Sequence, residues 1–212
     1  MDFRGFKINF LGDSITEGVG VSYPQNRYTD VFARKYGPIT VRNYGISGTR
    51  IARQIHPTKD HPEWDLDFCL RVKTMDPDAD LIVVFGGVND FGHGDAPFGI
   101  ETDRTPQTFI GACHTLLRTL IERYPTATVV MITPLHGTVE ERPGKHPLKD
   151  YVNVIRKVAA AYSVPILDLY SESGIQPKIS AQKKAYLPDG VHPNDAGAER
   201  IANRLAAFLH RL

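Results

Sequence analysis

The sequence contains little cysteine, no long apolar run and almost no net charge. Only Cys69 and Cys113 occur in 212 residues, and both lie in apolar helical patterns, which favours buried reduced thiols over a disulfide. No stretch approaches the roughly 18 consecutive apolar residues of a membrane span. The 25 basic and 24 acidic side chains leave a net charge of +1, and the basic residues are scattered. We therefore expect no nucleic acid and no anionic membrane as a partner.

Signatures of several other protein classes are also missing. The chain has no Gly-x-Ser-x-Gly elbow, which argues against an ordinary α/β-hydrolase, and neither a dinucleotide-binding glycine pattern nor a P-loop. Residues 1–7 contain no apolar segment of signal-peptide length, so we expect a cytoplasmic protein unless a signal has already been removed. Without a repeat, low-complexity tract or linker, we expect one domain over residues 1–212.

The chain does show a regular alternation of apolar strand-like runs and amphipathic helical segments. The apolar runs predict strands at residues 7–11, 40–44, 81–85, 127–132 and 164–169. Helical spacing predicts helices at residues 28–36, 64–75, 148–162 and 194–212, the last capped by Asn194. A further helix is expected to begin at Pro106 with Thr105 as its cap. This pattern predicts a three-layer α/β/α sandwich with a mainly parallel five-stranded sheet in the flavodoxin-like order 2-1-3-4-5.

Four short polar segments lie beside expected strand ends or helix starts. They are Phe-Leu-Gly-Asp-Ser-Ile-Thr-Glu-Gly at 10–18, Asn-Tyr-Gly-Ile-Ser-Gly at 43–48, Gly-Gly-Val-Asn-Asp at 86–90 and Asp-Gly-Val-His-Pro at 189–193. Ligands of a doubly wound sheet bind at the carboxyl ends of the strands, where the strand order reverses. Ser14, Gly48 and Asn89 follow the first, second and third strands, so we expect all three at one edge of the sheet.

These segments contain the residue types of a serine hydrolase site. The Ser14 hydroxyl would become a nucleophile if a neighbouring base removed its proton. His192 can be that base, and Asp189, three residues earlier, can orient its imidazole. The Gly48 amide and the Asn89 side chain can donate to an oxyanion. Each segment alone also has a structural interpretation: a helix cap at Ser14, turns at Gly48 and Asp189, and an ordinary loop at Asn89.

Together the four segments resemble the motifs of the SGNH/GDSL hydrolase family. The family's first block matches Gly12-Asp13-Ser14, with Ile15 in place of its leucine, and the other blocks match Gly48, residues 87–90 and residues 189–192. The resemblance spans residues 8 to about 195. It implies an α/β/α fold and an enzyme that needs no metal or organic cofactor, and it assigns a role to each site residue. The nucleophile would be Ser14, assisted by His192 and Asp189, and the oxyanion hole would consist of Asn89 and the amides of Ser14 and Gly48.

Five further residues are candidate substrate contacts. His93, in the loop after the third strand, could line a pocket or compete with His192 as base. Arg50 could contact a polar substrate or simply pair with an acidic residue. The other three are His136, which follows the fourth strand, and Asp13 and Asp90, which adjoin Ser14 and Asn89.

We therefore predict a serine esterase that hydrolyses a small-molecule ester through an acyl-serine intermediate. A small acyl group, such as acetyl, on a polar or sugar alcohol is the first choice of substrate. A lysophospholipase or acyl thioesterase is the alternative, and a non-catalytic ligand-binding protein on the same fold is a third reading. The sequence leaves the oligomeric state open.

Overall fold

The chain folds around a five-stranded parallel sheet. The computed structural model describes residues 3–37 and 40–212. Neighbouring strands pair in parallel in the order β2-β1-β3-β4-β5, which confirms the predicted fold class and strand order. The strands are β1 (Lys7–Gly12), β2 (Thr40–Gly45), β3 (Leu81–Phe85), β4 (Thr128–Ile132) and β5 (Ile166–Leu167).

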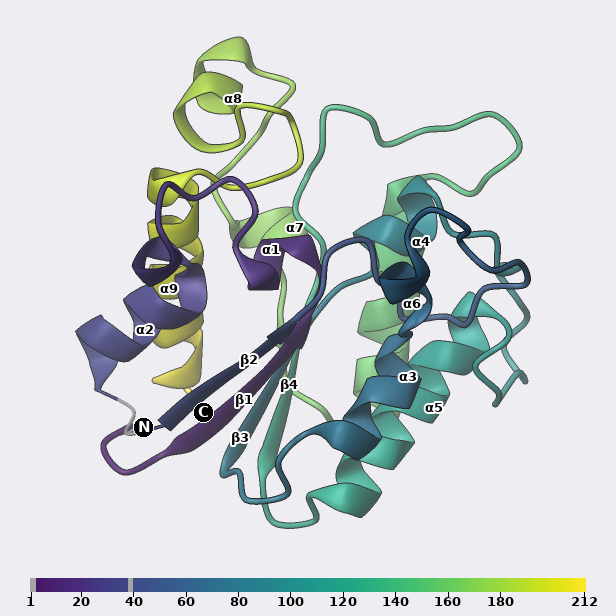
Figure 1. Cartoon of the computed structure of the whole chain (residues 1–212), viewed down its shortest axis with the longest axis horizontal. Coiled ribbons are helices and arrows are strands. Elements are labelled where there is room, and N and C mark those ends of the chain that lie inside the picture. The colour runs from purple at the N-terminus through teal and green to yellow at the C-terminus, as the bar shows by residue number, and fades with distance from the viewer. Residues whose placement is uncertain (1–2, 38–39) are drawn as a thin grey trace.

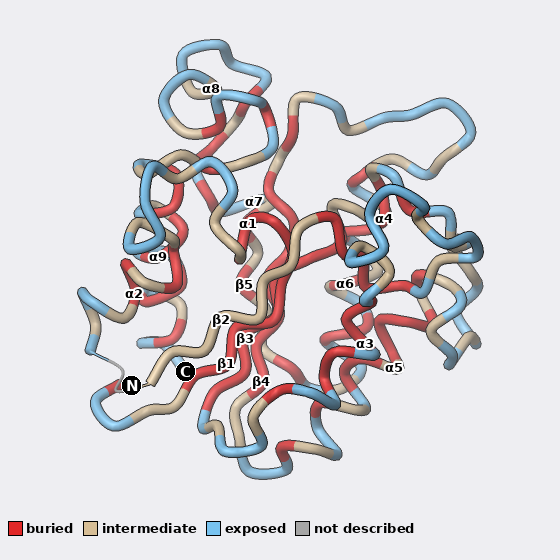
Figure 2. The backbone as a smooth tube through the Cα atoms, in the orientation of Figure 1, coloured by how far each residue is buried: buried red, intermediate tan, exposed pale blue. Residues whose placement is uncertain are grey.

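Helices cover both faces of the sheet (Figure 1). One face carries α2 (Tyr28–Tyr36) and α9 (Asp195–Leu209), and the other carries α3 (Phe68–Arg71), α5 (Phe109–Arg123) and α6 (Leu148–Ala161). Alternate residues of the strands belong to two hydrophobic cores, one on each face of the sheet. Ile82 and Val84 pack toward α5 and α6, whereas Leu81 and Val83 pack toward α2 and α9. All of β3 is buried, as Figure 2 shows, and this explains its continuous apolar run.

The strand register brings the carboxyl ends of β1, β2 and β3 to one level. Gly12, at the end of β1, pairs with Gly45 of β2 and with Phe85 of β3. The segments that follow these strands therefore leave the sheet from one edge. Two of them form short helices there, α1 (Ser14–Glu17) and α4 (Val88–Gly92).

The prediction of one helix over residues 64–75 is wrong. The segment forms η2 (Pro62–Asp65), α3 and η3 (Val72–Thr74). Asp67 interrupts the helix, because its backbone is extended at ψ 156° and its carboxylate accepts a hydrogen bond from the Leu70 amide. It therefore caps a new helix. Leu66 and Leu70, which suggested helical spacing, are 39% and 41% exposed.

The helix expected to begin at Pro106 begins at Phe109. Thr108, not Thr105, is its cap, because the Thr108 hydroxyl accepts a hydrogen bond from the Gly111 amide at 3.1 Å. The Pro106 carbonyl is instead 2.8 Å from the Arg53 amide, outside any helix. Both threonines are suitable cap residues. The hydrogen bond between Arg53 and Pro106, a tertiary contact that the local sequence does not encode, decides between Thr105 and Thr108 as the cap.

The remaining elements follow the prediction closely, with a few differences at their ends. Asn194 caps α9 as expected, accepting from the Gly197 amide at 3.0 Å. The strand predicted at 164–169 is shorter, because Asp168 leaves the sheet and precedes α7 (Leu169–Glu172). The sequence analysis did not identify η1 (Pro24–Asn26) or α8 (Ser180–Tyr186). Within the described residues, no helix is long and apolar enough to cross a membrane.

Candidate active site

Ser14 is held at the carboxyl end of β1 by a strand-to-helix turn. Asp13 is the N-cap of α1, and its Oδ1 accepts a hydrogen bond from the Ile15 amide at 3.0 Å. Ser14 is the first residue of α1 and is only 6% exposed. The first amides of a helix have no partner within that helix. The Ser14 N–H is therefore a donor that the helix itself does not use.

Three side chains from opposite ends of the chain form a continuous hydrogen-bond path. Nε2 of His192 lies 2.9 Å from Oγ of Ser14, and Nδ1 of His192 lies 2.6 Å from Oδ2 of Asp189. Oδ1 of Asp189 accepts from the amides of Val191 and His192 at 2.9 and 2.7 Å. The loop before α9 thus fixes both the carboxylate and the imidazole. The residues predicted as nucleophile, base and orienting carboxylate lie in contact.

Hydrogen bonding keeps Asp189 ionised. Burial acts to raise its pKa, but the amides of His192 and Val191 and the His192 ring outweigh that effect and hold the pKa below its ordinary value. An ionised carboxylate only accepts hydrogen bonds, so it favours a proton on Nδ1 of His192. Nε2 is then free to accept from the Ser14 hydroxyl. This is the tautomer that a general base needs.

Asn89 is linked to Gly48 by a hydrogen bond to the backbone of the next residue, Thr49. Gly48 has a left-handed φ of 73°, and a Cβ built there would fall 2.3 Å from ring carbons of Trp64. Only glycine combines that φ with so close an approach. Nδ2 of Asn89 donates to the Thr49 carbonyl at 3.0 Å. An amide nitrogen carries two hydrogens, so Asn89 keeps one for another acceptor.

Arg71 connects the segments around this site and was missed by the sequence analysis. Its guanidinium donates to the Gly12 carbonyl at 2.9 Å, to the Thr49 hydroxyl at 2.8 Å and to the Tyr44 carbonyl. Burial lowers the pKa of Arg71 to about 10, an effect that the Asp13 carboxylate opposes, so Arg71 is a cation at neutral pH. No sequence signal marks it, because a lone arginine in an amphipathic segment is ordinarily a surface residue.

The predicted substrate contacts Asp13 and Asp90 face the protein interior instead. The oxygens of Asp90 accept from the amides of Ile51 and Ala52, both at 2.9 Å, and Asp13 caps α1. Burial raises the pKa of each carboxyl to about 6. Neither residue borders the cavity beside Ser14. We therefore replace the predicted substrate contact by a supporting role for both.

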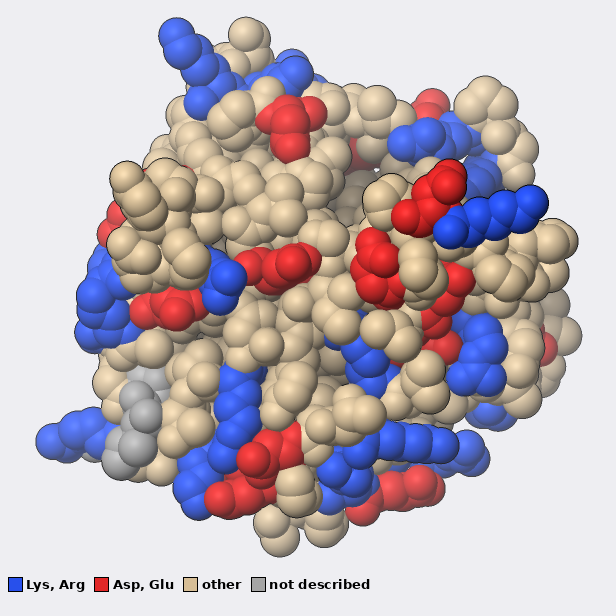
Figure 3. Space-filling model, viewed as in Figure 1, with Lys and Arg blue, Asp and Glu red and all other residues tan. Residues whose placement is uncertain are grey.

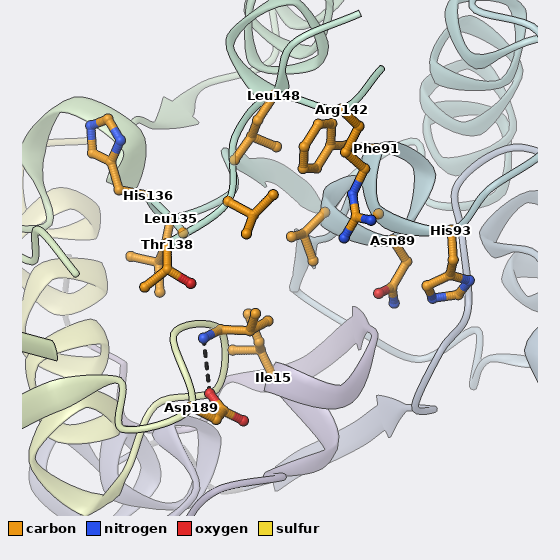
Figure 4. A pocket seen from close by; sticks show the side chains of 15 residues that line it. Ile15, Asn89, Phe91, His93, Leu135, His136, Thr138, Arg142, Leu148 and Asp189 are labelled. Atoms are coloured by element: carbon orange, nitrogen blue, oxygen red, sulfur yellow. Dashed lines mark hydrogen bonds between the residues drawn. The ribbon is translucent and has the colours of Figure 1, made fainter. Parts of the chain in front are cut away.

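A cavity of about 420 Å³ opens beside this hydrogen-bond path (Figure 4). Its wall includes Ile15, the residue after Ser14, together with Asn89 and Asp189, the carboxylate that binds His192. Two predicted substrate contacts, His93 and His136, also line it. Most of the remaining wall is apolar and includes Val88, Phe91, Leu135, Val139, Leu148 and Val191.

Arg50 lies behind this cavity rather than in its wall. It is 3% exposed and pairs with Asp65 at 2.8 Å, the alternative that its sequence position had left open. Its guanidinium also lies 3.0 Å from Nδ1 of His93. Burial, together with the positive charge of Arg50, lowers the pKa of His93 to about 4. His93 is therefore neutral, and His192 rather than His93 contacts Ser14.

No group of three or more His, Cys, Asp or Glu side chains within residues 3–37 and 40–212 could hold a metal ion. Cys69 and Cys113 are both buried and unbridged.

Comparison with known proteins places the chain in a family. It is 28% identical over 218 residues to the GDSL lipase Rv0518 of Mycobacterium tuberculosis, a match covering 99% of this chain and 84% of the relative. A crystal structure of a Lactobacillus plantarum protein is 33% identical, with a TM-score of 0.86 and 98% coverage of both chains. The lipase/acylhydrolase of Enterococcus faecalis has the same fold at 23% identity, with a TM-score of 0.65 and coverage of 96% and 95%. The family model for GDSL-like lipases and acylhydrolases matches residues 10–200, so this protein belongs to the GDSL-like lipase/acylhydrolase family.

Proposed function

We propose that this protein is a serine esterase in which Ser14 attacks a carboxylic ester. The observation that carries the proposal is the hydrogen-bond path from Asp189 through His192 to Ser14, with distances of 2.6 and 2.9 Å. A hydroxyl 2.9 Å from an imidazole nitrogen in the accepting tautomer is within reach for proton transfer. A ligand-binding protein would not require this path.

The reaction proceeds in two halves. Nε2 of His192 takes the Ser14 proton as Oγ attacks the ester carbonyl, and the amides of Ser14 and Gly48 with Nδ2 of Asn89 hold the resulting oxyanion. His192 then passes the proton to the leaving alcohol, which leaves an acyl group on Ser14. Water then attacks the acyl carbon as His192 removes its proton, and the tetrahedral intermediate collapses to the free acid while His192 returns that proton to Oγ of Ser14. Asp189 supports the imidazolium in both halves.

A small acyl group on a polar alcohol remains the first choice of substrate. It is supported by the polar groups of the cavity wall, namely His93, His136, Thr138 and Arg142. A second candidate, a lysophospholipase or acyl thioesterase, is favoured by the apolar remainder of that wall. The cavity volume of about 420 Å³ is within the ~300–1,000 Å³ of small-molecule sites and exceeds what an acetyl group needs.

Hydrolysis of p-nitrophenyl acetate, butyrate, octanoate and palmitate tests both parts. Ser14→Ala should lower kcat by at least ~10³-fold, because the residues of such a path act as a unit. Ser180→Ala, an exposed serine of α8 outside the cavity wall, is the matched control and should retain wild-type turnover. A maximum at acetate or butyrate supports the first substrate class, and a maximum at octanoate or longer supports the second.

A serine-directed fluorophosphonate probe separates enzyme from binding protein. Labelling of the wild type and of Ser180→Ala, but not of Ser14→Ala, supports the nucleophile. Near-normal turnover or labelling of Ser14→Ala would show that the nucleophile is misassigned. Failure of the folded wild type both to react with the probe and to hydrolyse any ester would favour a binding protein.

A further inference from the structure

The cavity wall contains a basic side chain, Arg142, that has no acidic partner in the part of the chain that the structure describes. Basic and acidic side chains are interspersed over the face shown in Figure 3. Inside the cavity, Figure 4 shows the guanidinium of Arg142 pointing inward between Phe91 and Asn89. Its Cζ lies 5.6 Å from the centre of the Phe91 ring. Among the described residues, no carboxylate lies within ion-pairing distance of Arg142, so its charge is directed at the cavity without an anionic partner.

A second cation lies behind the same part of the wall. Nζ of Lys145 donates to the Gly94 carbonyl at 2.6 Å and lies 3.4 Å from the Phe91 carbonyl. Carbonyl groups satisfy the ammonium hydrogens but do not neutralise its charge. Burial lowers the pKa of His93, and the positive charges of Arg50, Lys145 and Arg142 lower it further.

The carboxylates near the cavity are already engaged with other partners. Asp189 binds His192, and Asp90 accepts from two backbone amides. Glu140 binds His136 at 2.5 Å and Lys178 at 2.7 Å. Asp95 accepts from the amides of Ile55 and His56. None of these carboxylates forms an ion pair with Arg142, so its guanidinium remains available to an incoming anion.

We propose that Arg142 binds an anionic group, a carboxylate or a phosphate, carried by the ester substrate. The proposal rests on the proposed esterase function and names the substrate class of the same site. A guanidinium presents two parallel N–H donors that match the oxygens of either anion. The apolar side chains of Phe91, Leu135 and Leu148 would contact the carbon chain between the anionic group and the scissile ester. Lys145 adds charge at longer range without touching the substrate.

Matched pairs of anionic and neutral esters test this. One pair places the anion on the acyl side: the p-nitrophenyl monoester of adipic acid and p-nitrophenyl hexanoate. A second places it on the alcohol side: 4-acetoxybenzoate and its methyl ester. A third, 4-acetoxyphenyl phosphate against phenyl acetate, replaces carboxylate by phosphate. We expect the wild type to favour the anionic member of at least one pair, and the responding pair identifies the group and its side.

Arg142→Met removes the charge while keeping a flexible side chain of comparable length. We expect kcat/KM for the favoured anionic ester to fall by ~10–100-fold, mainly through KM, and kcat/KM for its neutral partner to stay within about twofold. Arg142→Lys should retain an intermediate preference. Arg118→Met is the control, because Arg118 is exposed on α5 and faces Glu122.

Two results would overturn the proposal while leaving the esterase function intact. One is Ser14-dependent hydrolysis with no anionic preference in any pair, and the other is an equal loss on both members in Arg142→Met. Calorimetric titration of adipate and phenyl phosphate into Ser14→Ala gives a readout that needs no turnover. Arg142-dependent binding there supports the anion site even if esterase activity fails, and equal or absent binding with and without Arg142 counts against it.

Discussion

Gly48→Ala tests whether the backbone at this position is part of the catalytic site. Gly48 has a φ of 73°, and the added Cβ would lie 2.3 Å from the Trp64 ring. Gly37 has the same φ of 73°, but a Cβ added there would lie 3.9 Å from its nearest neighbour, a side-chain carbon of Arg4. Gly37→Ala thus carries the same backbone strain without the collision, and Gly37 lies at the end of α2, away from Ser14.

The expected magnitudes follow from these two contributions. A left-handed conformation costs alanine ~1–2 kcal/mol, which in a chain of this size lowers Tm by ~2–8 °C in both variants. The Trp64 ring must also retreat by about 1 Å to reach ordinary contact with the new methyl group, and overpacking of this kind costs a further ~1–3 kcal/mol. If the loop moves instead of the ring, the Gly48 amide is displaced. Loss of one oxyanion donor lowers kcat by ~10²–10³-fold.

The assay is kcat and KM on p-nitrophenyl acetate, with Tm measured in parallel. We expect Gly37→Ala to keep wild-type kcat and Gly48→Ala to lose at least ~10²-fold. Adding Trp64→Ala to Gly48→Ala removes the colliding ring and should restore part of kcat, so that the two substitutions are strongly non-additive. The reasoning would be refuted by a Gly48→Ala protein with normal kcat and a Tm no lower than that of Gly37→Ala.

Two further predictions concern the carboxylates around Ser14. In Asp189→Asn the backbone amides of Val191 and His192 should still bind the side-chain oxygen, so that the side-chain NH₂ group faces Nδ1 of His192. This arrangement enforces the wrong tautomer of His192, and we expect kcat to fall ~10³–10⁴-fold with little change in Tm. Burial raises the pKa of Asp13 from 3.8 to about 6. The contribution of this carboxyl to the free energy of unfolding is therefore most favourable below pH ~4, where it is protonated in both states, and is lost as pH rises through 6. The free energy of unfolding at pH 7 relative to pH 4 should therefore be higher in Asp13→Asn than in the wild type by up to ~3 kcal/mol, measured by urea denaturation; an identical pH dependence would exclude this account.

The sequence predicted the parts of this fold that depend on local pattern. The apolar run of β3 is buried on both faces, and the Asn194 cap forms as its residue type suggests. The meeting of Ser14, Gly48 and Asn89 at one sheet edge follows from strand order alone, since parallel strands end together. Such features need no knowledge of distant contacts.

Features set by tertiary contacts were not predictable in the same way. The choice between Thr105 and Thr108 as a cap depends on how the preceding loop packs. The role of Arg71 arises because the ends of two strands and Thr49 converge on one buried point, which no local pattern records. Asp90 was expected to face substrate because it adjoins Asn89, but successive residues of the short helix α4 point in different directions. Proximity in sequence therefore overestimated the number of substrate contacts.

The groups that are hardest to stabilise lie around the candidate site. Within the described residues, the only buried side-chain nitrogen or oxygen atoms without a hydrogen-bond partner are Oδ2 of Asp13 and Nε of Arg50. Asp13 precedes Ser14, and Arg50 contacts His93 in the cavity wall. An unpaired buried polar atom costs ~1–3 kcal/mol. Gly48, whose left-handed φ would strain any other residue, lies in the same region. Departures from local stability rules are expected where function requires them. Their position beside the Ser14–His192–Asp189 path is thus an argument for this site that is independent of the motif resemblance.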